Sequence, residues 1–156
     1  MKITRVKANN RRKAFEVSTR SGLYLFPYVE TEPAPSGADR VRDVYPDKEI
    51  GREGFTYVLE SGREGTVHMD HVLEYNQDPG YMADMLLYDL TLEARRQVER
   101  SELSTREIIR RLGTSATQFY RLLDQTNTSK SLKQLVTLLT ILGCEVHLVV
   151  RQKRSA

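Results

Sequence analysis

The chain has 156 residues, enough for one ordinary domain or two small ones, and 29% of these residues are charged. No apolar stretch reaches the roughly 20 residues that a membrane-spanning helix needs. A single cysteine, Cys144, excludes an intramolecular disulfide and a cysteine-based metal cluster, so the composition predicts a cytoplasmic protein with no membrane segment.

The charged residues are distributed unequally between the two halves of the chain. The net charge of the whole chain is +3, with −1 on residues 1–78 and +4 on residues 79–156. A basic excess confined to one half is compatible with binding of a polyanion by that half. The charge therefore permits nucleic-acid binding in the second half and does not require it.

The first half of the chain has the alternating apolar and polar residues that are typical of strands. Two hairpins with Ser-Gly turns are predicted, one over residues 14–26 and the other over residues 55–69. The paired segments are 14–19 with 23–26, and 55–59 with 66–69. A shorter strand is expected at 41–45, so residues 1–78 are predicted to form a β-rich domain.

The second half changes to helical spacing of its apolar residues. Asp78 followed by Pro79 is typical of a helix start, because aspartate caps the helix and proline fits its first position. We therefore place the domain boundary at about residue 78. Five helices are expected, at 79–88, 92–100, 105–112, 115–123 and 132–142, followed by a β-strand from Glu145 to Val150. The predicted fold class is α+β, with an all-α second domain over residues 79–156.

The most informative stretch is a pair of short predicted helices joined by a Gly-Thr-Ser turn at residues 113–115. Ser104 and Glu107 have the spacing of a capping box at the start of the first helix. Both helices are too short to be stable alone, so their apolar faces must pack on the rest of the domain. That packing leaves Thr117, Gln118 and Arg121 on the opposite face, and these residue types can hydrogen-bond or contact base edges.

This pattern resembles the lambda-repressor-like, or XRE-type, helix-turn-helix family over about residues 90–145. The resemblance includes a Leu-Ser start, an acidic-aliphatic pair, Arg-Leu-Gly, a serine that opens the second helix, and a later leucine-rich helix. The matching positions are Leu103-Ser104, Glu107-Ile108, Arg111-Leu112-Gly113, Ser115, Phe119, Arg121-Leu122, Ser131-Leu132, Leu135, Leu139 and Leu142-Gly143.

The resemblance implies a sequence-specific transcriptional regulator that binds double-stranded DNA as a dimer, with the helix at 115–123 in the major groove. Four residues are then expected to face the bases: Ser115, Thr117, Gln118 and Arg121. Six others are expected to contact phosphates: Ser104, Thr105, Arg106, Asn127, Thr128 and Lys130. Thr105 and Ala116 stand where the family often has glutamine, which leaves the bases that are read undetermined.

The first half is similar to a small β-rich bacterial domain of unknown function that is fused ahead of such a motif. A strand after the helix-turn-helix also resembles some XRE-type antitoxins. We therefore expect a homodimer, with Glu145 to Val150 as one candidate contact. The alternative hypothesis is a protein-interaction module, such as an antitoxin component that binds a toxin and represses its own operon.

An enzyme is the least favoured hypothesis. His68, Asp70 and His71 form the only cluster that suggests a metal site, but a strand at 66–69 would point His71 away from the other two. Solvated residues at a strand end are the preferred interpretation. The sequence has no phosphate-binding Gly-rich loop and no nucleophile with a base at motif spacing, so we predict no catalytic residues, no metal and no cofactor.

Overall fold

The computed structural model describes residues 1–152, which form two compact units: Met1–Met82 and the residues from Ala83 onward. The division falls within helix α2 (Pro79–Arg100), a few residues after the expected boundary at 78. Strands precede helices along the chain, so the predicted α+β class is confirmed at this level. Residues 153–156, the end of the predicted second domain, lie outside the described residues.

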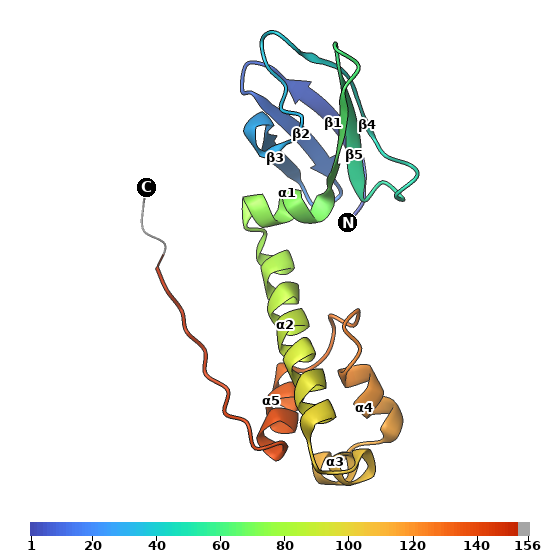
Figure 1. The fold of residues 1–156 in the computed structure, drawn as a ribbon, viewed down its shortest axis with the longest axis vertical. Helices are drawn as coiled ribbons and strands as arrows, with labels where there is room; N and C mark the ends of the chain where they lie inside the picture. Colours follow the sequence, from blue (N-terminus) through green and yellow to red (C-terminus); the bar gives the residue numbers. More distant parts are fainter. Residues whose placement is uncertain (153–156) are drawn as a thin grey trace. The chain divides into compact units, whose positions relative to one another are not determined.

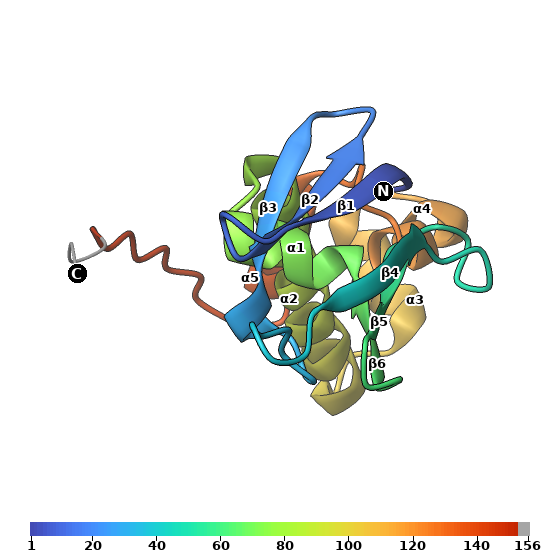
Figure 2. The same ribbon diagram turned by 90° about the horizontal axis from the view of Figure 1, so that it is seen from above.

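The first unit contains two three-stranded antiparallel sheets, ordered β1-β2-β3 and β4-β5-β6 (Figures 1 and 2). A short 3-10 helix, Tyr28–Glu30, follows β3. The six strands are β1 (Ile3–Asn9), β2 (Ala14–Thr19), β3 (Leu23–Pro27), β4 (Val41–Pro46), β5 (Gly54–Leu59) and β6 (Glu64–His68).

The two sheets enclose one shared aromatic core. Phe15 of β2 is fully buried, and its ring centroid lies 4.9 Å from that of Phe55 and 5.0 Å from that of Tyr57, both on β5. The backbone N–H of Ile3 also donates to the carbonyl of Arg52, at 2.8 Å, which joins β1 to the turn before β5. The aromatic residues of this half therefore hold the sheets together.

Both predicted hairpins are confirmed, although several features of this half were not predicted, among them the 3-10 helix at Tyr28–Glu30. Strand β1 was missed, β6 ends at His68 rather than at residue 69, and helix α1 (Met69–Asn76) follows it directly. Helix α1 packs on β3 and β6 through its buried apolar face. The Nδ2 of Asn76 donates to the carbonyl of Leu25, at 2.9 Å. His68 caps α1 without a side-chain hydrogen bond, so the sequence carries no capping signal there.

Gly65 on β6 provides a test of this packing. A Cβ atom at Gly65 would lie 2.6 Å from Cζ of Tyr57, whose buried hydroxyl donates to the carbonyl of Pro33 at 2.7 Å. Because that ring cannot shift freely, Gly65→Ala is expected to lower the free energy of unfolding of this unit by about 1–3 kcal/mol. The measurement is urea denaturation followed by the near-ultraviolet signal of the tyrosines.

Gly37→Ala is the matched control, since a Cβ atom at Gly37 meets nothing within 4 Å and its φ is not positive. This variant should stay within about 0.5 kcal/mol of the parent chain. Equal losses in the two variants would show that contact with Tyr57 does not explain the effect.

The second unit contains most of one long helix, and three short helices follow it among the described residues (Figure 1). The two helices expected at 79–88 and 92–100 are one continuous helix, α2, so the prediction of five was wrong. Thr91 does not cap a new helix: its hydroxyl donates to the carbonyl of Leu87, at 2.6 Å, one turn earlier. The three short helices are α3 (Thr105–Leu112), α4 (Ala116–Leu122) and α5 (Leu132–Ile141).

The helices of the second unit share a separate apolar core, to which all of them contribute. Helix α2 supplies Ala94, α3 supplies Ile108 and α4 supplies Phe119 and Leu122, while α5 supplies three leucines. The fully buried members include Ala94, Ile108, Leu135 and Leu138. Each short helix is therefore held by tertiary packing rather than by its own propensity.

The predicted C-terminal strand is not formed. From Glu145 to Gln152, the last described residue, the chain has no strand pairing and is exposed. A strand needs a neighbour for its backbone N–H and C=O groups, and no other described segment supplies one. Among residues 1–152, no helix is both long and apolar enough to cross a membrane.

Candidate nucleic-acid interface

Helices α3 and α4 begin and end at residues that fix their geometry. The hydroxyl oxygen of Ser104 accepts from the backbone N–H of Glu107 at 3.2 Å, and that of Ser115 accepts from Gln118 N–H at 3.1 Å. Gly113 ends α3 with a φ of 71°, a left-handed conformation that glycine adopts without steric cost. The predicted turn between the two helices is therefore present, and the helix expected at 115–123 spans Ala116–Leu122, with Ser115 as its N-cap.

Helix α4 has one buried face and one exposed face. Phe119 is 1% exposed and Leu122 4% exposed, and both belong to the core of the helical unit. Tyr120, the next residue after Phe119, is 61% exposed. The core therefore fixes the orientation of α4 and leaves its remaining face to solvent.

The residues predicted to read bases all lie on exposed positions, from the N-cap of α4 to its last turn. Ser115 is the N-cap, while Thr117, Gln118 and Arg121 lie within the helix. Within residues 1–152, no hydrogen bond or ion pair engages the side chains of these last three residues. They are therefore brought to one surface with their polar groups available.

The arginines around this surface differ in their partners. The Glu107 carboxylate accepts hydrogen bonds from Arg110 and Arg111, which lowers the pKa of Glu107 to about 2. Arg106 and Arg121 have no acidic partner within 4.0 Å among the described residues. Of these four arginines, Arg106 and Arg121 are therefore the two without an ion pair to any described residue.

The six predicted phosphate contacts are not equivalent in the structure. Thr105, Arg106 and Thr128 are exposed, and the first two lie in the first turn of α3. Ser104 is exposed but serves as the helix cap. The side chain of Asn127 is engaged inside its loop: Nδ2 donates to the Arg121 carbonyl at 3.3 Å, and Oδ1 accepts from the Ser129 backbone N–H at 3.1 Å.

Lys130 has a role that the sequence did not predict. Its Nζ donates to the hydroxyl of Thr91 and to the carbonyl of Leu122, both at 2.9 Å, and to the carbonyl of Asp124. An ammonium group has three donors, so all of them are used within the helical unit. Burial lowers the pKa of this amine, and the Asp124 carboxylate opposes that change. Lys130 thus joins α2 to the end of α4 and has no donor left for a phosphate in this arrangement.

Tyr120 is a further exposed residue on α4 that was not included in the predicted site. It lines a hollow of about 400 Å³ together with Leu123, Asp124 and three residues of α2: Arg95, Val98 and Glu99. Adjacent residues of a helix point in different directions, so Phe119 and Tyr120 are not expected to face the same core. The two adjacent aromatic residues in the sequence were therefore the sign that one of them is exposed.

The histidine cluster of the first unit is arranged differently from the strand-based expectation. His68 ends β6, whereas Asp70 and His71 lie in the first turn of α1. The imidazole centroids of His68 and His71 are 6.4 Å apart. Among residues 1–152, no group of three His, Cys, Asp or Glu side chains has a metal-binding arrangement.

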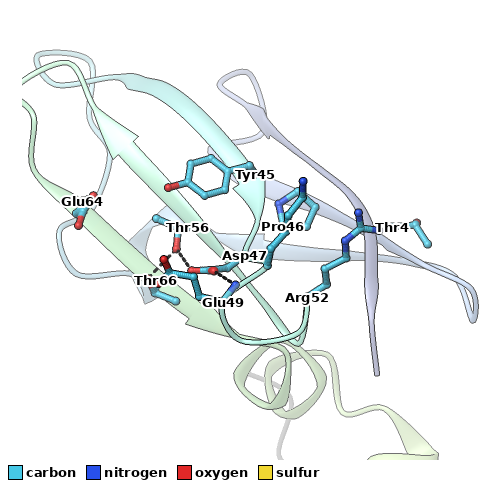
Figure 3. A pocket seen from close by; sticks show the side chains of 10 residues that line it. Thr4, Tyr45, Pro46, Asp47, Glu49, Arg52, Thr56, Glu64 and Thr66 are labelled. Carbon is cyan, nitrogen blue, oxygen red and sulfur yellow. Dashed lines mark hydrogen bonds between the residues drawn. The ribbon is translucent and has the colours of Figure 1, made fainter.

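The first unit also has an open polar hollow of about 810 Å³ beside the turn between β4 and β5 (Figure 3). Asp47 accepts from the hydroxyl of Thr56 and from the backbone N–H of Glu49, which lowers the pKa of its carboxyl. The hydroxyls of Thr56 and Thr66 lie 2.8 Å apart. The Asp47 carboxylate therefore stabilises the turn between β4 and β5 through these hydrogen bonds.

No protein-family model, no curated protein and no solved structure matches this chain.

Proposed function

We propose that this chain is a sequence-specific DNA-binding transcriptional regulator of the helix-turn-helix type. The observation that carries the proposal is the orientation of α4. Phe119 and Leu122 anchor the helix in the core of the helical unit. The side chains of Thr117, Gln118 and Arg121 face solvent, and none of them has a hydrogen-bond or ion-pair partner within residues 1–152. The major groove of B-form DNA is about 12 Å wide, which is enough to admit an α-helix such as α4.

Each exposed side chain on α4 has a defined chemistry for base edges. The guanidinium of Arg121 can donate two hydrogen bonds to O6 and N7 of guanine, and the amide of Gln118 can pair with N6 and N7 of adenine. The methyl group of Thr117 can contact the methyl group of thymine. Together these residues provide polar donors, an acceptor and one apolar contact on a single helix face.

The phosphate contacts are assigned to exposed residues that flank α4. Arg106 supplies a positive charge at the start of α3, and Thr105 and Thr128 supply hydroxyls. Phosphate contacts set the register of a protein on the duplex, while base contacts specify the sequence. In a dimer, two copies of α4 would enter successive major grooves about 34 Å apart.

The first test is selection of binding sites from random double-stranded DNA with the full chain, followed by affinity measurements on Arg121→Ala. Loss of a bidentate guanine contact is expected to weaken binding to the selected site by about 1–3 kcal/mol and to relax specificity at one base position. The measurement is a titration of labelled DNA of the selected sequence and of its single-base variants.

Arg110→Ala is the matched control, because it removes the same charge from a guanidinium that is already bonded to Glu107. This variant should retain the base preferences of the parent chain. If Arg121→Ala bound the selected site as tightly and as selectively as the parent, the assignment of α4 as the reading helix would be wrong. Failure to select any sequence would contradict the proposed function itself.

A further inference from the structure

The segment after α5 exposes a continuous run of apolar side chains. Leu148 is 81% exposed, Val149 69% and Val150 85%. Figure 1 draws this segment as an extended trace that follows α5, and no described strand pairs with it. Soluble chains seldom leave such a β-prone run unpaired, because its backbone groups and apolar side chains both gain from a partner.

The side chains of this segment separate into two faces when the backbone is extended. Val146, Leu148 and Val150 alternate along the chain and would form one wholly apolar face. Glu145, His147, Val149 and Arg151 would form the other. Nε2 of His147 lies 3.3 Å from a carboxylate oxygen of Glu145, consistent with two side chains on the same side of an extended strand.

We propose that this segment pairs with the same segment of a second copy of the chain, as an antiparallel two-stranded ribbon centred on Leu148. In that register each Leu148 faces its counterpart, and each Val146 faces the partner's Val150. All six of these side chains lie on one face of the ribbon. On the other face, each Glu145 stands opposite the partner's Arg151, so that two ion pairs close the two ends.

The charges select this register over its neighbours. A shift by one residue places residues from opposite faces against each other and breaks the apolar face. Centring the pair on His147 sets Glu145 against Val149, while centring it on Val149 sets His147 against Arg151. A parallel pairing would set Glu145 against Glu145, which is destabilising. The antiparallel register centred on Leu148 satisfies both the apolar face and the charges.

A second copy of the chain is the partner that fits, because the segment is complementary to itself. A two-stranded ribbon is marginally stable in water, so its affinity is expected to be modest, with a dissociation constant of about 1–100 μM. The pairing does not depend on DNA binding. If the proposed function also holds, the ribbon would relate two α4 helices by a two-fold axis and favour operators with two-fold symmetry.

The test is sedimentation velocity of the full chain across a concentration series, without DNA. Glu145→Arg and Arg151→Glu, made singly, each create two like-charged pairs and are expected to raise the dissociation constant of the dimer by about 5- to 30-fold. The double variant with both changes restores opposite charges and should recover the affinity of the parent. Both positions lie in the exposed segment, so folding is not at risk.

Leu148→Asp places two like charges at the centre of the apolar face and should leave the chain monomeric throughout the series. Leu132→Asp is its control: Leu132 is a 58% exposed leucine at the first position of α5, where an acidic residue is favourable. A monomeric parent chain at about 500 μM would overturn the inference, as would single charge reversals that have no effect or a double variant that is not rescued. If the chain dimerised as expected but recovered no sequence from random DNA, the proposed function would be contradicted, while the ribbon would still be supported.

Discussion

Phe119→Ala is expected to lower the free energy of unfolding of the helical unit by about 3–5 kcal/mol, the usual effect of removing a buried phenylalanine. Phe119 is 1% exposed and packs among residues from α2, α3 and α5. Helix α4 has seven residues, too few to stay helical without that contact. The measurement is urea denaturation of the full chain followed by helical circular dichroism.

The adjacent Tyr120 supplies the control, because it is aromatic, lies on the same helix and is 61% exposed. Tyr120→Ala should change stability by no more than about 0.5 kcal/mol. If Phe119→Ala leaves the helical unit unfolded, Phe119→Leu keeps most of the volume and should cost less than about 1.5 kcal/mol. A larger loss from Tyr120→Ala than from Phe119→Ala would show that α4 presents the opposite face to the core.

The features that were predictable from sequence are those whose physical cause lies within a few residues. Ser104, Ser115 and Ser131 each accept a hydrogen bond from the backbone N–H three residues later. Gly113 and Gly143 both have positive φ at helix ends. Because these interactions are local, the sequence located the starts of α3, α4 and α5 and the turn that presents the candidate site.

The errors occurred where tertiary packing decided between two local possibilities. Thr91 can cap a helix or bond back to a carbonyl within one, and its complete burial beside Ala94 in the core of the helical unit favours the second. Helix α1 has no side-chain cap and is fixed by packing on β3 and β6. Whether 145–150 is a strand depends on a partner that its own residues do not supply within one chain.

The candidate site shows the same distinction. Helical periodicity was sufficient to predict that Thr117, Gln118 and Arg121 share an exposed face, because that face is defined by the neighbours Phe119 and Leu122. The position of Lys130 could not be predicted in this way. One of its acceptors, the hydroxyl of Thr91, is 39 residues away in sequence, and only the fold brings the two together.

Lys130→Met is expected to destabilise the helical unit by about 2–3 kcal/mol, because it removes a charged donor and leaves the carbonyls of Leu122 and Asp124 without that partner. Methionine retains the apolar stem, so the loss reports mainly on the ammonium group. For a unit of this size the melting temperature should fall by about 10–20 °C. Thermal unfolding of the full chain, followed by circular dichroism, measures the change.

Lys133→Met is the matched control, since Lys133 is exposed in the first turn of α5 and the substitution removes the same charge. It should leave the melting temperature nearly unchanged. The helix-turn-helix resemblance alone makes the opposite prediction for Lys130: a phosphate contact would leave stability intact and reduce the salt dependence of DNA binding by about one ion. If Lys130→Met left the melting temperature unchanged and made the salt dependence of DNA binding flatter, Lys130 would be a phosphate contact rather than a contact within the helical unit. A large fall in melting temperature would instead identify Lys130 as the residue that fixes the end of α4 against α2.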